Sequence, residues 1–407
     1  MVKACKVIAL VLVCASLMSA RNSSPAFTEK SPRVFSIGAT NLQALRDRIR
    51  NNREKDPAIE KLRSRANKAL DMQPVSVMQK NAIPPSGDKH DYLSLARYWW
   101  PDPTKPHGLP YMRRDGEVNP EIRQVEDKNH LDEMITATSR LSLAYYLFGD
   151  EKYAAQAAKL MRAWFLDPTT RMNPNMNHAQ LTRGRNIGRG SGLIDSRRLS
   201  NVVDTIGLLA SSKSWTAEDQ SGMEKWFRDY LKWLRNSDNG RDESQAENNH
   251  GSFYDVQVAS IALFTGDVDL ATKVLKRETN RIAYQIDKDG GQPRELDRTR
   301  SLWYSTFNLT ALFQLARLGE SVGVDLWSFQ TKDGRSIRKA LDYLTPYVTG
   351  EKKWPYKQID EYKSDAIVPV YLEAAVKYKN PEYEKIARQL HPGAWDDIGW
   401  VLESQAD

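Results

Sequence analysis

Residues 131–165 read LDEMITATSRLSLAYYLFGDEKYAAQAAKLMRAWF, and this stretch decides the fold class. Its pattern predicts a helix over Leu131–Phe148, a turn at Gly149-Asp150 and a second helix over Lys152–Phe165. Gly149 stands where a helix often ends in a left-handed residue, a conformation that glycine adopts without steric cost. The stretch therefore predicts two antiparallel helices joined by a short turn.

The same pattern recurs along the chain. Helical spacing also covers residues 41–51 and 57–72, and later predicted helices end at Gly266-Asp267, Gly319 and Asn380-Pro381. The units have no fixed sequence period, which disfavours ankyrin and TPR arrays. With about twelve helices and no convincing strand ladder, we expect an all-α protein, an α/α toroid built as an incomplete double ring of helix hairpins. An α-solenoid is the alternative.

The first twenty residues have the character of an export signal. Lys3 and Lys6 give a basic start, Val7 to Val13 form an apolar run, and Ala20 is a small residue suited to cleavage. Neither this run nor any later stretch is long enough to span a bilayer. We therefore expect a periplasmic or secreted protein with no stable membrane span.

Both cysteines, Cys5 and Cys14, fall within this leader, so the mature chain would carry no disulfide or cysteine metal site. Cys14 leaves lipid anchoring open. Removing residues 1–20 takes away two lysines and no acid, so 59 basic against 52 acidic residues become 57 against 52, a net charge of +5. This mild basicity suits an acidic ligand, and no nucleic-acid module is recognisable.

We divide the chain into a signal peptide at 1–20, an N-terminal tail at 21–38 and a single catalytic domain at 39–407, and we expect a monomer. One segment of the domain, from Pro74 to Pro120, is irregular and rich in proline. Such a long loop is unusual in a compact domain unless it serves a function.

Two polar segments are the candidate reaction site. The first, ENNHGSFY at residues 247–254, precedes a buried helix whose N-terminus Asn248 or Asn249 could simply cap. Two adjacent asparagines exceed what one cap needs, Gly251 opens space beside His250, and Tyr254 lies one turn onward. These features weigh against a simple cap, and the partner segment at residues 294–304 is what favours a site.

The second segment is RELDRTRSLWY at residues 294–304. Arg300 and Tyr304 are four residues apart on a predicted helix and should project together, and Arg298 can reach the same space. A nearby positive charge favours the phenolate, so we expect the pKa of Tyr304 to lie below about 10. The alternative is a half-buried packing residue with its hydroxyl in water.

Asn, His, Arg and Tyr side chains without metal ligands suit β-elimination at a uronic acid. Arg and Asn can neutralise the carboxylate next to C5. His250 and Tyr304 can act as base and acid, or Tyr304 can do both. No His spacing resembles a metal site, so we expect no metal and no cofactor.

The two segments together resemble the alginate lyase superfamily, in particular polysaccharide lyase family 38 and, more distantly, family 5. KHDYLSLARYWWPDP at 89–103 and GLPYMRRDG at 108–116 resemble its N-terminal signature. The resemblance implies metal-independent cleavage of an anionic polysaccharide, namely alginate or a related polyuronate such as mannuronan or glucuronan. It implies Asn249 as the carboxylate neutraliser, His250 as base or neutraliser, Tyr304 as acid and possibly base, and Arg298 or Arg300 as the guanidinium.

Further residues are candidates to bind the polymer. Aromatic rings can stack on sugars and arginines can pair with carboxylates, although the aromatic residues can equally plug into the core. The Gly- and Arg-rich stretch at 183–198 is either a polyanion-binding loop or a solvated surface loop. The predicted substrate-binding residues are Tyr92, Trp99, Trp100, Arg113, Arg114, His178, Asn248, Tyr254 and Arg300.

Two other functions remain open from sequence. A glycoside hydrolase acting on uronate-containing oligosaccharides needs two carboxylates that flank the bond, and Glu243, Glu247, Asp255 and Glu295 are available. A non-catalytic polysaccharide-binding helical protein needs neither acid nor base.

Overall fold

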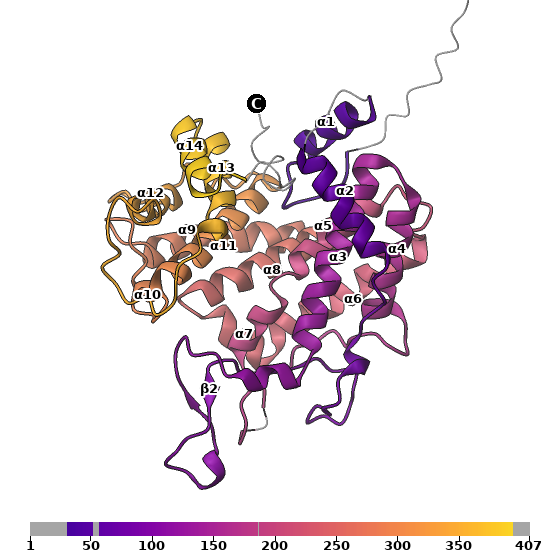
Figure 1. Cartoon of the computed structure of the whole chain (residues 1–407), viewed down its shortest axis with the longest axis horizontal. Coiled ribbons are helices and arrows are strands. Elements are labelled where there is room, and N and C mark those ends of the chain that lie inside the picture. The colour runs from indigo at the N-terminus through magenta and orange to yellow at the C-terminus, as the bar shows by residue number, and fades with distance from the viewer. Residues whose placement is uncertain (1–30, 52–56, 186, 394–407) are drawn as a thin grey trace, which may run out of the picture. The chain divides into compact units, whose positions relative to one another are not determined.

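The computed structural model describes residues 31–51, 57–185 and 187–393 (Figure 1). These form fourteen α-helices: α1 (Ala39–Arg50), α2 (Pro57–Leu70), α3 (Asp127–Phe148), α4 (Glu151–Met161), α5 (Leu199–Leu209), α6 (Ala217–Asn236), α7 (Asp238–Ser244), α8 (Asn249–Thr265), α9 (Val268–Gln285), α10 (Pro293–Leu296), α11 (Ser301–Glu320), α12 (Ile337–Val348), α13 (Val368–Lys377) and α14 (Pro381–Leu390). Short helical turns are η1 (Val77–Gln79), η2 (Pro106–Gly108), η3 (Pro120–Gln124), η4 (Arg162–Leu166), η5 (Gly190–Ser196) and η6 (Ser364–Ala366).

Two layers of helices build the body. The inner helices α3, α5, α8, α11 and α13 contact one another in that order, and α4, α6, α9, α12 and α14 pack against them from outside. Helices next to each other in sequence are mostly joined by short turns, as at α3–α4 and α8–α9. The fold is an α/α toroid, as predicted, and the alternative of an α-solenoid is wrong.

Helix α8 lies at the centre of this arrangement (Figure 1). Every residue from Gly251 to Phe264 is buried, because the helix contacts α5, α6, α9 and α11 on its different sides. A helix that is buried all round must satisfy its polar side chains internally. Gln257, for example, accepts the hydroxyl of Ser196 at 2.8 Å. Packing on all sides fixes the N-terminus of α8, where the first polar segment lies.

The predicted turns are confirmed at two glycines. Gly149 and Gly266 end α3 and α8 with φ values of 75° and 86°. Asp150 and Asp267 then cap the following helices through their side chains. These caps explain why each hairpin closes within one or two residues.

Two other predicted turns differ from the structure. Helix α11 runs past Gly319 to Glu320, and a Cβ at Gly319 would stand 2.3 Å from the carbonyl oxygen of Val324. Glycine is needed there for a close backbone approach and not for a turn. Asn380 does not end α13 in a left-handed conformation; it caps α14, and Lys379 takes the positive φ of 50°.

The segment before residue 39 is bound to the body. The backbone N–H groups of Phe35 and Ser36 donate to the Asp204 carboxylate at 2.7 and 2.8 Å, and Arg33 donates to the Leu263 carbonyl at 2.7 Å. Residues 33–36 are therefore held against the helices, although they precede the predicted catalytic domain. The predicted signal peptide and the tail up to residue 30 lie outside the described residues. Among the residues described, no helix has the length and apolar character needed to cross a membrane.

The proline-rich segment is largely irregular, as predicted, but it contains short strands. β1 (Leu93–Leu95) pairs in parallel with β4 (His178–Leu181), and β2 (Trp99–Trp100) pairs with β3 (Met112–Arg113) in antiparallel register. Pairs of two to four residues are too short to produce a readable alternation in sequence. We call residues 97–119 the arm; it carries β2 and β3 and projects from the helices in Figure 1.

Candidate active site

A cavity of about 880 Å³ lies between the arm, η5, α7 and the N-termini of α8 and α11. Its wall contains Asn248, Asn249 and His250 from the first polar segment and Arg298 and Tyr304 from the second. The structure thus brings the two segments together in one concave space, the usual form of a ligand site.

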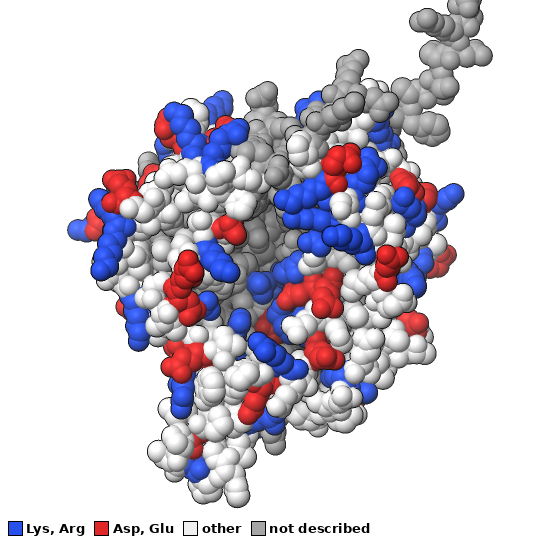
Figure 2. All heavy atoms as spheres, viewed as in Figure 1, with Lys and Arg blue, Asp and Glu red and all other residues white. Residues whose placement is uncertain are grey.

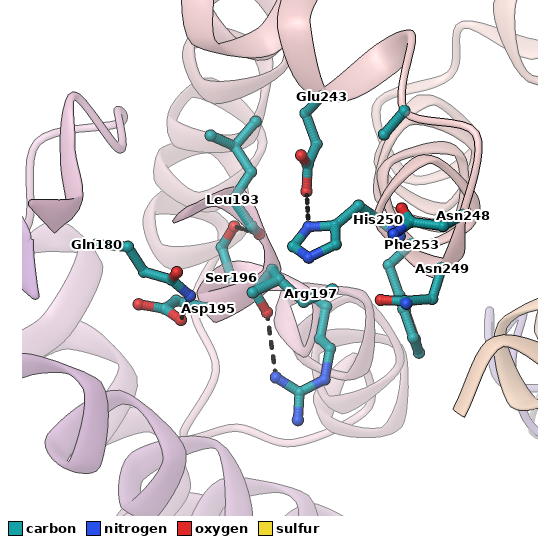
Figure 3. Close-up of polar contacts among 12 residues, drawn as sticks. Gln180, Leu193, Asp195, Ser196, Arg197, Glu243, Asn248, Asn249, His250 and Phe253 are labelled. Carbon is teal, nitrogen blue, oxygen red and sulfur yellow. Dashed lines mark hydrogen bonds and ion pairs between the residues drawn. The ribbon is translucent and has the colours of Figure 1, made fainter. Parts of the chain in front are cut away.

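His250 lies in the first turn of α8 and is paired with an acid. Its Nδ1 is 2.7 Å from Oε1 of Glu243, a side chain that is 3% exposed on α7. Because an ionised carboxylate can only accept a hydrogen bond, a neutral imidazole in this position carries its proton on Nδ1 and leaves the lone pair on Nε2. Figure 3 shows Glu243 on one edge of the ring and the opposite edge facing the space in which Arg197 lies. The imidazole is therefore set up to accept a proton from a ligand.

The two asparagines have different tasks. Asn248 is the N-cap of α8, since its side chain accepts the backbone N–H of His250 at 3.2 Å. Asn249 is buried, and its Nδ2 donates to both oxygens of Glu295 at 2.9 Å. One asparagine therefore satisfies the cap, and the other is held by a carboxylate behind the cavity wall.

Arg298 is held by the arm. Its Nε and Nη2 donate to the Asp115 carboxylate, the shortest bond being 2.7 Å, and Asp115 also accepts the N–H of Thr299 at 3.1 Å. Burial opposes ionisation of Asp115, but the bonds from Arg298 and Thr299 hold its pKa well below the usual range. Nη1 of Arg298 is left for a ligand. The arm therefore supplies the acid that orients the cavity's guanidinium.

Tyr304 is buried at the start of α11, and its hydroxyl donates to the hydroxyl of Tyr98 on the arm at 2.9 Å. Burial and Tyr98 raise the pKa of Tyr304, and Arg298 only partly offsets this rise. The prediction of a lowered pKa is therefore wrong, because Asp115 neutralises the arginine and burial penalises the phenolate. Tyr304 is kept as a protonated phenol.

Arg300 was the alternative guanidinium, and the structure separates it from Arg298. Its Nε is 2.6 Å from Oδ2 of Asp360, and its guanidinium lies over Trp303. It forms no part of the cavity wall. Arg300 is the N-cap residue of α11, and its side chain contacts Asp360 and Trp303, although the spacing of four predicted that it projects together with Tyr304.

Comparison with known proteins agrees with this arrangement. The sequence profile of the alginate lyases matches residues 76–354. A crystal structure of an alginate lyase from Bacteroides ovatus is 37% identical, covers 91% of this chain and 99% of that chain, and superposes with a TM-score of 0.86. The chain belongs to the alginate lyase family. It is accordingly a polysaccharide lyase.

More distant members share the fold of this lyase. Alginate lyase A1-III from Sphingomonas species A1 is 17% identical, with a TM-score of 0.53 over 84% of this chain and 86% of that chain. A histidine-to-alanine variant of A1-III complexed with a tetrasaccharide is 16% identical, with a TM-score of 0.56 over 86% and 90% of the two chains. No curated protein matches the sequence. The assignment to family 38 or family 5 stays a prediction.

Two residues predicted to bind substrate in this lyase are core residues. Tyr92 is fully buried and donates its hydroxyl to Asp195 at 3.2 Å. Tyr254 is 6% exposed and donates to the carbonyl of Leu234 at 3.3 Å. Neither ring has a free face for a sugar, so both predictions are wrong. Tyr254 follows His250 by one helical turn, but on a helix buried all round that turn points into the core.

The other predicted binding residues divide between the cavity and its surroundings. Trp99, Arg113 and Asn248 line the cavity. Trp100 and Arg114 do not line it: the indole donates to the Glu117 carbonyl at 2.9 Å and the guanidinium lies over that indole. His178 is likewise outside the wall, with Nε2 3.6 Å from Asp91. Adjacent residues of a strand face opposite sides, which separates Trp99 from Trp100.

The site prediction left out three arginines of the cavity wall that have no acidic partner among the described residues. Arg189 and Arg197, both from the Gly- and Arg-rich stretch, line the cavity with Arg97. Arg197 donates to the Ile194 carbonyl at 3.1 Å, and Arg189 lies over Trp99. No ion pair to a described acid is formed by any of the three. Burial lowers the pKa of both Arg189 and Arg197, as expected for cations held ready for an anion.

The remaining surface has mixed charge. Figure 2 shows basic and acidic side chains side by side over much of the face it draws. Within residues 31–51, 57–185 and 187–393, no group of three His, Cys, Asp or Glu side chains has the arrangement of a metal site. The arginines considered for substrate binding are therefore those that line the cavity.

Proposed function

We propose that this lyase cleaves alginate or a related polyuronate by β-elimination in the cavity described above. The observation that carries the proposal is the placement of an acid-paired imidazole, a protonated tyrosine and unpaired guanidinium groups in one concave wall. Such a wall fits a sugar that is anionic and that must lose a proton at one atom while gaining one at another.

His250 is the proposed base. Nε2 takes the C5 proton, the C5–H electron pair forms the C4–C5 double bond, and the C4–O bond breaks. Glu243 stabilises the imidazolium that results, since its carboxylate already holds Nδ1.

Tyr304 is the proposed acid. Its hydroxyl protonates the departing O4, and a raised pKa keeps that proton in place until the oxygen becomes basic. The two groups are reset when the imidazolium loses its proton and the phenolate gains one from water. Proton and charge therefore balance over one turnover.

Carboxylate neutralisation is assigned to Arg298 and Asn249. Proton removal at C5 places a second negative charge beside the carboxylate, so donors that strengthen on this charge lower the barrier. Arg298 has Nη1 available because Asp115 occupies the other two nitrogens. Asn249 contributes an amide that is fixed before the sugar arrives.

The hydrolase alternative is disfavoured by where its acids lie. Glu243 lines the cavity but is bonded to His250, and Glu295 lies behind the wall and is bonded to Asn249, so neither carboxylate is free to act on a ligand. The other two are paired elsewhere: buried Asp255 with Arg277 and Arg281, and exposed Glu247 with Arg294. A pair of free carboxylates is what inverting and retaining hydrolysis both need.

A substrate panel tests the proposal. Polymannuronate, polyguluronate, glucuronan and a glycosaminoglycan are incubated with the protein, and the ultraviolet absorbance of the unsaturated product is followed. We expect a rise on at least one polyuronate, with product length then giving endo or exo cleavage. New reducing ends without absorbance would support the hydrolase, and neither signal would support a binding protein.

We also infer that the protein is exported and acts as a monomer. The leader at residues 1–20 supports export to the periplasm or beyond. Size-exclusion chromatography with light scattering on the mature chain tests the monomer.

A further inference from the structure

A buried carboxylate, that of Glu295, lies directly behind Asn249. Glu295, on the short helix α10, is 1% exposed. It accepts the backbone N–H of Asn249 at 2.6 Å and Nδ2 of the same residue at 2.9 Å to each oxygen. All of these bonds go to Asn249, a residue of the cavity wall.

These bonds decide which edge of the amide faces the cavity. An amide oxygen turned toward an ionised carboxylate would be repelled, whereas Nδ2 is attracted. With Nδ2 held by Glu295, the amide cannot turn over. Both oxygens of one carboxylate can share a single N–H of Nδ2, so the second N–H is the group left to donate to a ligand carboxylate. Without the acid, both orientations of the side chain would be open.

The protonation of Glu295 is set by opposing effects. Burial raises the pKa of Glu295, and the bonds from Asn249 and the proximity of Arg298 and His250 only partly offset that rise. The acid thus lies within electrostatic reach of three residues assigned to the reaction. Glu295 thus places the Asn249 amide beside the charged residues that a bound uronate would contact.

The backbone ahead of Asn249 is fixed separately. Gln285 on α9 donates to the Asn248 carbonyl at 3.1 Å and accepts Nδ2 of Asn308 at 3.0 Å. Asn308 also donates to Gln292 at 2.8 Å. This buried amide network holds the start of α8 in addition to the bond from the Asn249 backbone N–H to Glu295. The two contacts of Glu295 with Nδ2 are the ones directed at the side-chain amide.

We propose that Glu295 is a positioning residue of the lyase reaction, which orients the amide of Asn249 toward the substrate carboxylate. The inference rests on the proposed function, in which Asn249 touches the uronate. In the Glu295→Gln variant, an N–H group replaces one acceptor and meets Nδ2 of Asn249, so the amide turns over or swings away. Volume is preserved, while the charge and one of the two acceptor oxygens are lost.

A double-mutant cycle tests the proposal. Glu295→Gln is made in the wild-type and in the Asn249→Ala background, and kcat and KM are measured on the best polyuronate. Acting through Asn249, Glu295→Gln lowers kcat/KM about 10- to 100-fold in the wild type and less than about 2-fold in Asn249→Ala. An equal loss in both backgrounds overturns the proposal. Glu247→Gln, the same substitution at an exposed neighbour, is the matched control and should stay within about 2-fold.

The cycle separates this inference from the proposed function. Full activity of Asn249→Ala overturns the role of Asn249 in the mechanism, whereas a damaged Asn249→Ala with additive losses overturns only the role of Glu295. If Glu295→Gln does not fold, Asn249→Asp provides the test with Glu295 in place. Two carboxylates at hydrogen-bond distance share one proton, so activity of Asn249→Asp should fall more steeply with rising pH than that of wild type. An unchanged pH profile overturns the proposal.

Discussion

The guanidinium of Arg298 lies over the ring of Tyr304, with 3.8 Å between Cζ and the ring centroid. Asp115 on the arm takes two of its nitrogens, so the arginine reaches the tyrosine as one half of an ion pair. An isolated cation at this distance would favour the phenolate, but the paired one does not overcome burial. The relationship explains how the site can bring a guanidinium to the substrate and still keep its acid protonated.

Removal of the phenolic hydroxyl tests the acid. Tyr304→Phe should lower kcat by about 10²- to 10⁴-fold, because only the proton-transfer group is lost. Binding should persist, since the ring and its contact with Arg298 remain. Product absorbance gives the rate and titration with an oligouronate gives the affinity. Loss of binding with kcat retained would assign Tyr304 to substrate recognition instead.

The two candidate arginines are distinguished by the same conservative change. Arg298→Lys should lower kcat/KM about 100-fold, because a lysine cannot keep both bonds to Asp115, cover the ring and donate to a ligand. Arg300→Lys should change it by less than about 3-fold, because its partner Asp360 is a surface acid. Equal losses in the two variants would contradict the assignment of the guanidinium to Arg298.

The pH dependence reports on Tyr98. This residue helps to raise the pKa of Tyr304, so Tyr98→Phe should bring that pKa down toward its usual range. The acid must be protonated to act, so the variant should lose kcat at a lower pH than wild type does on the alkaline side. Profiles of kcat with circular dichroism at each pH make the comparison. An alkaline limb that does not move would show that burial alone sets the pKa.

The helices were predictable because capping residues mark where one helix ends and the next begins. Gly149 with Asp150 and Gly266 with Asp267 end one helix and begin the next within the same few residues, so local sequence is enough. The grouping of His250, Arg298 and Tyr304 was predictable because chemistry limits which residues suit proton transfer beside a carboxylate. Both inferences use interactions that are short in sequence or fixed by reaction type.

The acids that hold Arg298 and Asn249 could not be predicted from the sequence, and the reason is physical. Asp115 and Arg298 are 183 residues apart, and Glu295 lies 46 residues from Asn249. Nothing local marks which of 52 acidic residues will meet which motif residue, since these contacts are created only by the packing of the arm and of α10. The wrong pKa for Tyr304 follows from the same gap, because it counted the arginine without its acid.

Unpaired arginines in the cavity are expected to bind substrate carboxylates. Arg197→Gln should raise KM at least about 10-fold, because a charge-assisted hydrogen bond to the substrate is lost. Arg197 forms no ion pair with a described acid, so no competing bond offsets this loss. Arg198→Gln is the matched control. Its guanidinium already bonds Thr136 at 3.0 Å and Asp132 at 3.3 Å, so KM should change less than about 2-fold. Similar KM values in both variants would place the substrate away from η5.

Asp204 on α5 links stability to pH through its bonds to the segment before α1. It holds the N–H groups of Phe35 and Ser36, and burial raises its pKa to about 6. A carboxyl whose folded pKa is raised stabilises most below its unfolded pKa of about 3.9, and this contribution is lost as pH rises through the folded value. Asp204→Ala should therefore reduce the free energy of unfolding by about 1–3 kcal/mol near pH 4 and by less near pH 7.5. Denaturant unfolding of both proteins across this range measures the difference. A gap that widens with pH would mean that the ionised form is the stabilising one, with the two backbone bonds outweighing burial.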